Sequence, residues 1–217
     1  MTISKRISDH VLAAHVAINN ALADDDIIAS LSLYGYDEAR LRGGQELLSQ
    51  VEELRQDQKV GYGEQYDATA SFKLAWAKAN EAYKHALKLA RITFKTNAKA
   101  RAALLLDGKR HSKFSNWLEQ AGTFYANLLG QPDLLAAMSH FGYDRHRLET
   151  EQALVEAVAE NHRRQEVRRG DAHHGTAERN AALNELNDWM MTFRAAATVA
   201  LADRPQQLEK LGFGNGA

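Results

Sequence analysis

Cysteine is absent from this 217-residue chain, and proline occurs only twice. Without cysteine the protein forms no disulfide, offers no thiol nucleophile and cannot hold a metal through thiolate ligands. An excess of one charge is also lacking, because 27 Lys and Arg residues face 28 Asp and Glu residues, for a formal net charge of -1. A nearly neutral chain is not drawn as a whole to nucleic acid or anionic lipid, so any basic surface must be local.

Long hydrophobic runs are missing as well. The longest apolar-leaning stretch, residues 195–202, is far shorter than the roughly 20 residues that a membrane-spanning helix needs. Residues 1–9 mix Lys5, Arg6 and Asp9 with scattered apolar side chains, unlike a secretory signal peptide. We therefore expect a cytoplasmic protein with no membrane partner.

The residues that are present favour helix throughout. Hydrophobic residues make up 45% of the chain and charged residues 25%, as in an ordinary packed protein. Ala, Leu, Glu, Lys, Arg and Gln are abundant, and no segment alternates β-branched with polar residues. The predicted fold class is an all-α helical bundle.

A four-residue motif occurs twice and reveals a longer internal similarity. Residues 34–37 read Tyr-Gly-Tyr-Asp and residues 141–144 read Phe-Gly-Tyr-Asp. Aligning the chain with itself at an offset of about 107 residues makes further identical residues coincide without a gap. The coinciding pairs include Asn20/Asn127, Arg40/Arg147, Gln45/Gln152, Gln58/Gln165, Thr69/Thr176 and Ala90/Ala197. The sequence thus predicts a tandem duplication, with one repeat over residues 1–107 and a second over 108–217, the two sharing one core.

Each repeat is expected to contain five helices. Their predicted ranges are 5–23, 25–34, 37–60, 64–95 and 97–106 in the first repeat, and 112–130, 132–141, 144–168, 171–203 and 205–211 in the second. Pro132 and Pro205 suit the first position of a helix. Gly61, Gly63 and Gly170 indicate tight turns, so the two long helices of each repeat should form an antiparallel hairpin.

The repeated aromatic-Gly-Tyr-Asp motif has two interpretations. An aromatic pair beside an acid can bind a sugar or a cation. Alternatively, Gly35 and Gly142 end one helix in the left-handed conformation, Asp37 and Asp144 cap the next, and the flanking aromatic residues act as a hydrophobic staple. This interpretation accounts for every residue of the motif. The larger aromatic residues at helical spacing can likewise line a pocket or fill the core. They are Trp76, Tyr83, Trp117, Phe124, Tyr125, Trp189 and Phe193.

Known catalytic and cofactor motifs are absent. No Glu stands three residues before any of the nine His residues, so the paired Glu-x-x-His of di-iron bundles is missing. Zinc-protease, serine-hydrolase, phosphate-loop and dinucleotide motifs are missing too. We therefore expect no cofactor and favour binding over catalysis.

Polar residues on the apolar stripe of the long helices are candidates for ligand binding. This set comprises Gln45, Arg55, Gln58, Gln152, His162 and Gln165. If they face inward they line a polar gap in the bundle and need hydrogen-bond partners. The alternative is that they are half-exposed residues near the ends of the hairpins.

Basic residues recur at helical spacing in the first repeat only. This stripe consists of Lys84, Lys88, Arg91, Lys95 and Lys99. Residues 84–113 together contain nine basic residues and one acid, Asp107. Such a segment can bind phosphate, RNA or an acidic helix, or it is simply a solvated face.

A metal site is conceivable at the predicted hairpin near Gly170. An antiparallel turn there would bring His174 and Glu178 close to Glu166 and His162, and imidazole with carboxylate suits zinc or nickel. Neighbouring arginines would repel a cation and could pair with the same glutamates.

Three functions remain open from these observations. The first is a non-enzymatic protein that binds another protein or itself, with Trp117, Phe124 and Tyr125 forming an apolar face for self-association. The second is a small-molecule carrier or enzyme that uses the polar gap. The third is a protein that binds phosphate or nucleic acid through the basic stripe.

Overall fold

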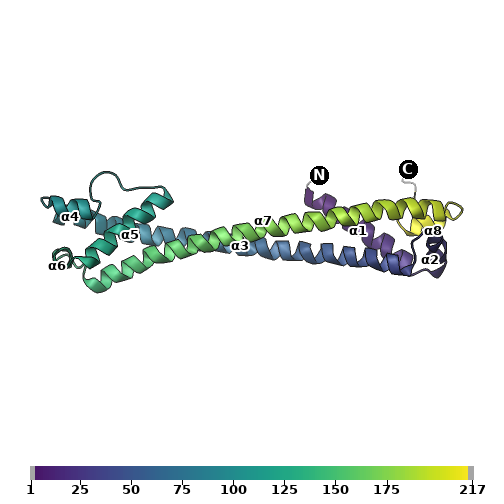
Figure 1. Cartoon of the computed structure of the whole chain (residues 1–217), viewed down its shortest axis with the longest axis horizontal. Helices are drawn as coiled ribbons and strands as arrows, with labels where there is room; N and C mark the ends of the chain where they lie inside the picture. The colour runs from purple at the N-terminus through teal and green to yellow at the C-terminus, as the bar shows by residue number, and fades with distance from the viewer. Residues whose placement is uncertain (1–2, 215–217) are drawn as a thin grey trace. The chain divides into compact units, whose positions relative to one another are not determined.

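Helices account for almost all of the computed structural model, which describes residues 3–214 and gives only the backbone of residues 3–6 (Figure 1). The described helices are α1 (Ile3–Leu22), α2 (Asp25–Ser32), α3 (Glu38–Thr93), α4 (Ala98–Ala103), α5 (Phe114–Gly130), α6 (Pro132–Ser139), α7 (Arg145–Ala200) and α8 (Pro205–Lys210). No strand occurs within residues 3–214, which confirms the all-α class. Among the helices described, none combines the length and the apolar character needed to span a membrane.

The predicted hairpins are wrong, because each pair of long helices is one continuous helix. Helix α3 runs for 56 residues through Gly61 and Gly63, and α7 runs for 56 residues through Gly170. A glycine costs a helix only about 1 kcal/mol, which side-chain contacts along its length can offset. Helices α3 and α7 pack antiparallel (Figure 1).

The described chain divides into two compact units, at positions other than the predicted repeat boundary. Unit 1 comprises residues 1–62 and 171–217, and unit 2 comprises residues 63–170. Each unit therefore takes helices from both predicted repeats, 1–107 and 108–217. Three hydrophobic clusters are described, each lying within one unit and each built from both halves of the sequence. One core shared by the two repeats stays a prediction.

Unit 1 packs α1, α2 and α8 against the first part of α3 and the last part of α7. Its buried side chains include Ile27, Leu31 and Leu41 from the first half of the chain and Phe193 and Leu201 from the second. A neighbouring cluster joins α1 to the same two long helices. The unit is thus closed by contacts between the two ends of the sequence.

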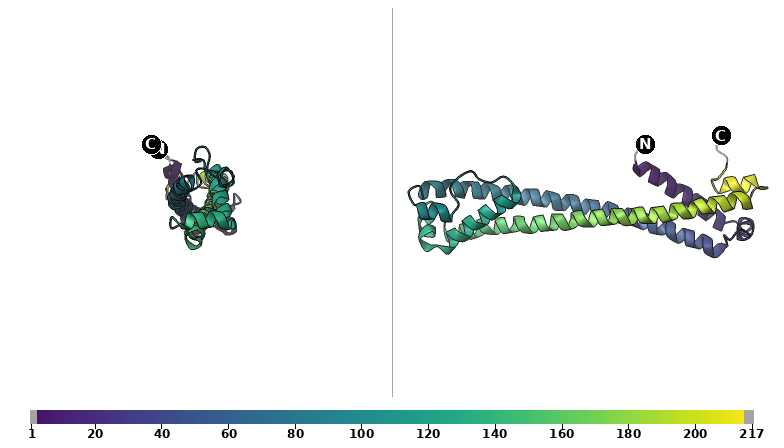
Figure 2. Two further views of the ribbon diagram at one scale, coloured as in Figure 1. Left: turned by 90° about the vertical axis from the view of Figure 1, so that its left-hand side faces the viewer. Right: turned by 45° about the horizontal axis from the view of Figure 1, so that its top comes forward.

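Unit 2 packs α4, α5 and α6 against the last part of α3 and the first part of α7 (Figure 2). Most of the aromatic residues expected either in a pocket or in the core are fully buried. Those with no exposed surface are Tyr83, Trp117, Phe124, Tyr125 and, in unit 1, Phe193. The apolar face on which we based self-association is therefore covered inside unit 2.

Helix ends agree closely with the local signals in the sequence. Gly35 and Gly142 have φ values of 80° and 74°, the left-handed conformation expected after a helix end. A carboxylate oxygen of Asp37 accepts a hydrogen bond from the backbone N–H of Arg40 at 2.8 Å, and Asp144 accepts from Arg147 at the same distance. The capping roles of the glycines and aspartates are confirmed. Of the flanking aromatic residues, Tyr36 and Tyr143 are buried, whereas Tyr34 and Phe141 are exposed.

Candidate functional site

The basic stripe lies on unit 2 but does not follow a single helix. Lys84, Lys88 and Arg91 are on α3, Lys95 follows the end of α3, and Lys99 is on α4. All are exposed except Arg91, which is half-buried. The stripe is therefore divided between two helices and their connection.

Arg91 positions the chain that returns after α4. Its Nε donates to the backbone oxygen of Leu106 at 3.0 Å, and its Nη2 donates to the backbone oxygen of Gly108 at 2.8 Å. This anchor lays the following residues along α3, where the guanidinium of Arg110 donates to the side-chain oxygen of Asn80. Arg110, although distant from Lys84 in the sequence, thus lies on the same surface as Lys84.

Two clefts meet at Arg110. The first, of about 550 Å³, is lined by Lys84, His85, Leu87, Lys88, Arg91, Ile92 and Arg110. The second, of about 300 Å³, is lined by Lys73, Trp76, Ala77, Asn80, Arg110 and Ser112. We call the two together the basic groove. Five Lys and Arg side chains line it, and neither cleft has an Asp or Glu in its lining.

Little of this charge is neutralised by carboxylates. Nζ of Lys84 lies 3.2 Å from a carboxylate oxygen of Glu81, and both side chains are exposed. Over the part of the chain that the structure describes, Lys73, Lys88 and Arg110 make no ion pair with an acid. An exposed pair such as the one at Lys84 is worth only about 0–1 kcal/mol, so an anionic ligand can replace it.

Trp76 adds an aromatic surface to the smaller cleft. The residue is half-buried, with its ring centroid 5.4 Å from that of Phe114 and 5.9 Å from that of Trp117. These neighbours hold the indole in place while part of it faces the cleft. The sequence singled out the stripe, and it gave Trp76 as an aromatic residue that lines a pocket or fills the core. It did not point to Lys73 or Asn80, although their spacing places them on the same face of α3.

An offset of 107 residues relates this face of α3 to uncharged residues of unit 1. The residues 107 positions after Lys73, Trp76, Lys84, Lys88 and Arg91 are Asn180, Leu183, Met191, Ala195 and Thr198. The helical framework is therefore built with neutral side chains at these positions in unit 1. The basic groove of unit 2 is not required for the fold.

The six polar ligand candidates do not converge on one pocket. Gln45, Arg55 and Gln58 belong to unit 1, whereas Gln152, His162 and Gln165 belong to unit 2. Gln45 donates to the side chain of Asn19 at 3.2 Å. Gln58 and Gln165 bridge the long helices, since Gln58 donates to Thr176 at 2.9 Å and Gln165 donates to Thr69 at 3.4 Å. His162 stacks on Phe114 with ring centroids 4.3 Å apart.

The predicted metal cluster loses its geometry with the hairpin. His162 and His174 lie on one continuous helix, α7, where their separation of twelve residues corresponds to about 18 Å along the axis. His174 Nε2 instead lies 3.3 Å from a carboxylate oxygen of Glu178, and Glu166 pairs with Arg169 at 2.5 Å. Within the described residues, no three His, Asp or Glu side chains are placed to hold a metal ion.

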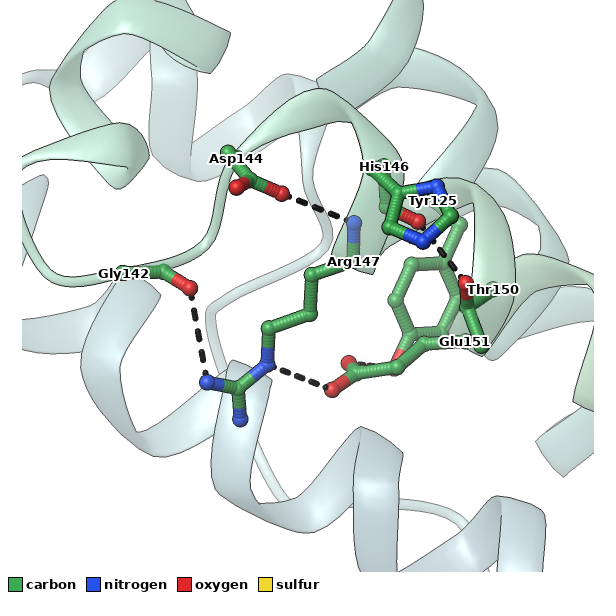
Figure 3. A network of polar contacts seen from close by, with 7 residues as sticks. All are labelled: Tyr125, Gly142, Asp144, His146, Arg147, Thr150 and Glu151. Carbon is green, nitrogen blue, oxygen red and sulfur yellow. Dashed lines mark hydrogen bonds and ion pairs between the residues drawn. The ribbon is translucent and has the colours of Figure 1, made fainter.

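One buried polar network was not foreseen from the sequence (Figure 3). The Glu151 carboxylate accepts a hydrogen bond from the Tyr125 hydroxyl at 2.9 Å and another from Nε of Arg147 at 3.1 Å. Burial, reinforced by the Glu151 charge, raises the pKa of Tyr125. Partial burial by itself lowers the pKa of the Arg147 guanidinium, but the hydrogen bond to Glu151 and nearby charges outweigh this and raise that pKa overall. The hydroxyl thus stays protonated as a donor, and the network is structural. Its signal in the sequence is an acid, Glu151, on an apolar stripe, whereas the residue 107 positions earlier is Gly44.

Comparison of this chain with protein families, with curated proteins and with solved structures gave no match. Any function must therefore be argued from the groove and the fold.

Proposed function

We propose that the protein is a non-enzymatic binding protein that holds single-stranded nucleic acid in the basic groove of unit 2. The observation that carries the proposal is the convergence of Lys73, Lys84, Lys88, Arg91 and Arg110 on two adjoining clefts with no carboxylate in their lining. Because the chain as a whole is nearly neutral, this local concentration of charge specifies where a polyanion would bind.

The chemistry of the groove suits a flexible strand better than a duplex. Proteins that bind single strands combine a cationic path for the phosphates with aromatic side chains on which bases stack. Trp76 lies between Lys73 and Lys84 along α3, and Lys84 and Lys88 are one helical turn apart, about 6 Å along the axis. This order supports phosphate contacts along α3 and base stacking at Trp76.

Fluorescence anisotropy with a labelled single-stranded oligonucleotide tests the proposal. For about five phosphate contacts, affinity should fall roughly 100-fold between 50 and 200 mM salt. The variant Lys84→Gln/Lys88→Gln/Arg110→Gln should bind at least about tenfold more weakly and show a shallower salt dependence.

A matched control removes the same charge elsewhere. Arg42, Arg163 and Arg164 are exposed arginines that pair with glutamates outside the groove. The variant with Gln at these three positions should bind as the wild type does. Equal losses in the two triple variants, or no binding by the wild type at low salt, would exclude the groove as a nucleic-acid site.

Stacking on Trp76 is tested by Trp76→Leu, which places at this position the residue type found at Leu183 in unit 1. Loss of one stacked base costs about 1–3 kcal/mol, or roughly 5- to 150-fold in affinity. The salt dependence should stay unchanged, because no charge is removed. Circular dichroism checks that the variant folds.

We also propose that the chain arose by duplication of a unit of about 107 residues. Support comes from the helix bounds: α2 begins at residue 25 and α6 at 132, α3 at 38 and α7 at 145, and α4 at 98 and α8 at 205, an offset of 107 in each case. The bridges Gln58–Thr176 and Gln165–Thr69 occupy corresponding positions as well. The cytoplasmic location remains a prediction from the sequence.

A circular permutant tests the duplication. If the copies are equivalent, a break between Asp107 and Gly108 corresponds to the natural chain ends. A chain that starts at 108, runs to 217 and continues through a Gly/Ser linker into residues 1–107 should keep the helix content and melting behaviour of the wild type. Failure to fold would argue against equivalent copies.

A further inference from the structure

A second cationic cleft lies in unit 1, whereas the basic groove belongs to unit 2. It has a volume of about 350 Å³ and is lined by Ile7, Arg55, Gln58, Lys59, Tyr62, Thr176 and Arg179. Three cations thus come from two helices, α3 and α7, and the lining contains no Asp or Glu. The volume is within the range of about 300–1,000 Å³ that is usual for small-molecule sites.

Hydrogen bonds hold the cations of this cleft in place. Nη1 of Arg179 donates to the side-chain oxygen of Gln58 at 2.8 Å, and the Gln58 amide donates to Thr176 Oγ1 at 2.9 Å. The hydroxyl of Tyr62 lies 3.2 Å from the same Thr176 oxygen. Nη2 of Arg55 donates to Ser8 Oγ at 2.9 Å. Both guanidinium groups are therefore oriented by neutral oxygens.

No carboxylate of the described residues neutralises the two arginines of this cleft. Among the side chains described, Arg55, Lys59 and Arg179 make no ion pair with a carboxylate. Three cations placed close together repel one another, and this repulsion is relieved when an anion binds between them. The charge of the cleft therefore favours an anionic ligand.

In unit 2 the residues at an offset of 107 from those of the cleft pack together and leave no cationic cleft. The counterparts of Ile7, Arg55 and Arg179 are Phe114, His162 and Phe72. These rings pack together, with centroids 4.3 Å apart for Phe114 and His162 and 5.2 Å apart for Phe72 and His162. The supporting Gln–Thr bridge is present in both units. The framework therefore permits an aromatic filling, and the open cationic cleft is particular to unit 1.

We propose that this cleft binds a phosphorylated small molecule. Arginine presents a planar fork of N–H donors that matches phosphate oxygens, and three cations suit a group carrying close to two negative charges. Ile7 and Tyr62 offer an apolar wall for the remainder of the ligand. The site shares no residue with the nucleic-acid groove and does not depend on it.

Isothermal titration calorimetry with inorganic pyrophosphate tests the site on the full chain. We expect saturable binding that weakens at least tenfold in Arg55→Gln/Arg179→Gln and is unchanged in Arg42→Gln, an exposed arginine on the same helix. Lys88→Gln/Arg110→Gln should also leave it unchanged. Loss of binding in that last variant would assign pyrophosphate to the basic groove and overturn the proposal, as would the absence of saturable binding.

A second measurement uses the wild-type protein, so that a folding defect in a variant does not decide the result. Pyrophosphate should shift the NMR signals of the Arg55 and Arg179 Nε–H groups along one saturation curve. Unchanged signals at saturating pyrophosphate would overturn the proposal. Citrate binding more tightly than pyrophosphate at the same signals would contradict the phosphate chemistry.

Discussion

Units 1 and 2 have the same arrangement of arginine, tyrosine and glycine at a helix cap, but they differ in the side chains that pack next to this cap. In unit 1 the Arg40 guanidinium lies 4.3 Å from the Tyr36 ring centroid and donates to the Gly35 oxygen at 3.1 Å. In unit 2 Arg147 lies 3.8 Å from the Tyr143 ring centroid and donates to the Gly142 oxygen at 3.4 Å. The cap is the same in both units because it depends only on local contacts.

Below the cap, unit 2 is polar and unit 1 is apolar. Arg147 continues to Glu151 and Tyr125, whereas the corresponding residues of unit 1 are Gly44 and Ile18. The space beside Gly44 is taken by the indole of Trp189, whose counterpart in unit 2 is Ala82. One framework thus accepts either a hydrogen-bonded network or an aromatic side chain, provided that the volumes match.

The largest effect is expected at Gly44. A Cβ atom there would overlap the indole ring of Trp189, so Gly44→Ala must displace the indole and should destabilise unit 1 by about 2 kcal/mol. A Cβ atom at Gly43 would instead point into open space, with no neighbour within 4 Å, and Gly43→Ala should stabilise the helix by about 0.5–1 kcal/mol. Thermal melting of both variants measures the contrast. A shift of the same sign in both would show that Trp189 does not constrain Gly44.

A somewhat smaller difference should separate the two cap arginines. Arg147→Met removes the cap and also deprives the buried Glu151 of its cation, whereas Arg40→Met removes only the cap. The bond to a charged group adds about 1.5 kcal/mol to the loss in unit 2. Chemical denaturation of the two variants tests this, and equal losses would mean that Glu151 gains nothing from Arg147.

Alkaline pH should weaken unit 2 before unit 1. Burial raises the pKa of Tyr83 and of Tyr125 above the ordinary value of 10.0, whereas their counterparts in unit 1, Met190 and Ile18, do not ionise. The stability from these groups is complete below about pH 10 and declines above it, because the unfolded chain then releases protons that the folded chain retains. Melting temperatures on either side of pH 10 should differ less in Tyr83→Phe/Tyr125→Phe. An undiminished difference would refute the assignment.

The smallest effect is expected on the surface of unit 2. Hydrogen bonds from Arg163 and Arg164 lower the pKa of Glu160 to about 2, whereas the counterparts of these arginines in unit 1 are Gln56 and Asp57. The contribution of Glu160 is present above its ordinary pKa of 4.5 and is lost as pH falls through about 2. NMR titration of the carboxyl group should move toward 4.5 in Arg163→Gln/Arg164→Gln. An unchanged midpoint would assign the low pKa to another cause.

The short helices and their ends could be predicted because their signals act within a few residues. Pro132 and Pro205 begin α6 and α8 as expected, and Gly35 and Gly142 adopt the left-handed conformation. The glycines at 61, 63 and 170 misled the prediction. Whether such a residue ends a helix depends on what packs against it, and here α3 and α7 support each other.

The basic groove could be predicted in part. The cations on α3 follow from their spacing, but their association with Arg110 depends on the anchor that Arg91 provides for the returning chain. The metal hypothesis failed because it relied on a tertiary contact that the structure does not contain. It placed His162 near His174 through a turn that the continuous α7 does not make.

The sequence alone thus determined the helical class, the caps, the repeated motif and the concentration of positive charge, since these depend on composition and on neighbours within about one helical turn. Tertiary structure decided which helices pair, because similar apolar stripes allow several pairings and only simultaneous burial selects among them. It therefore also decided that Arg55 and Arg179, from different halves of the chain, line one cleft.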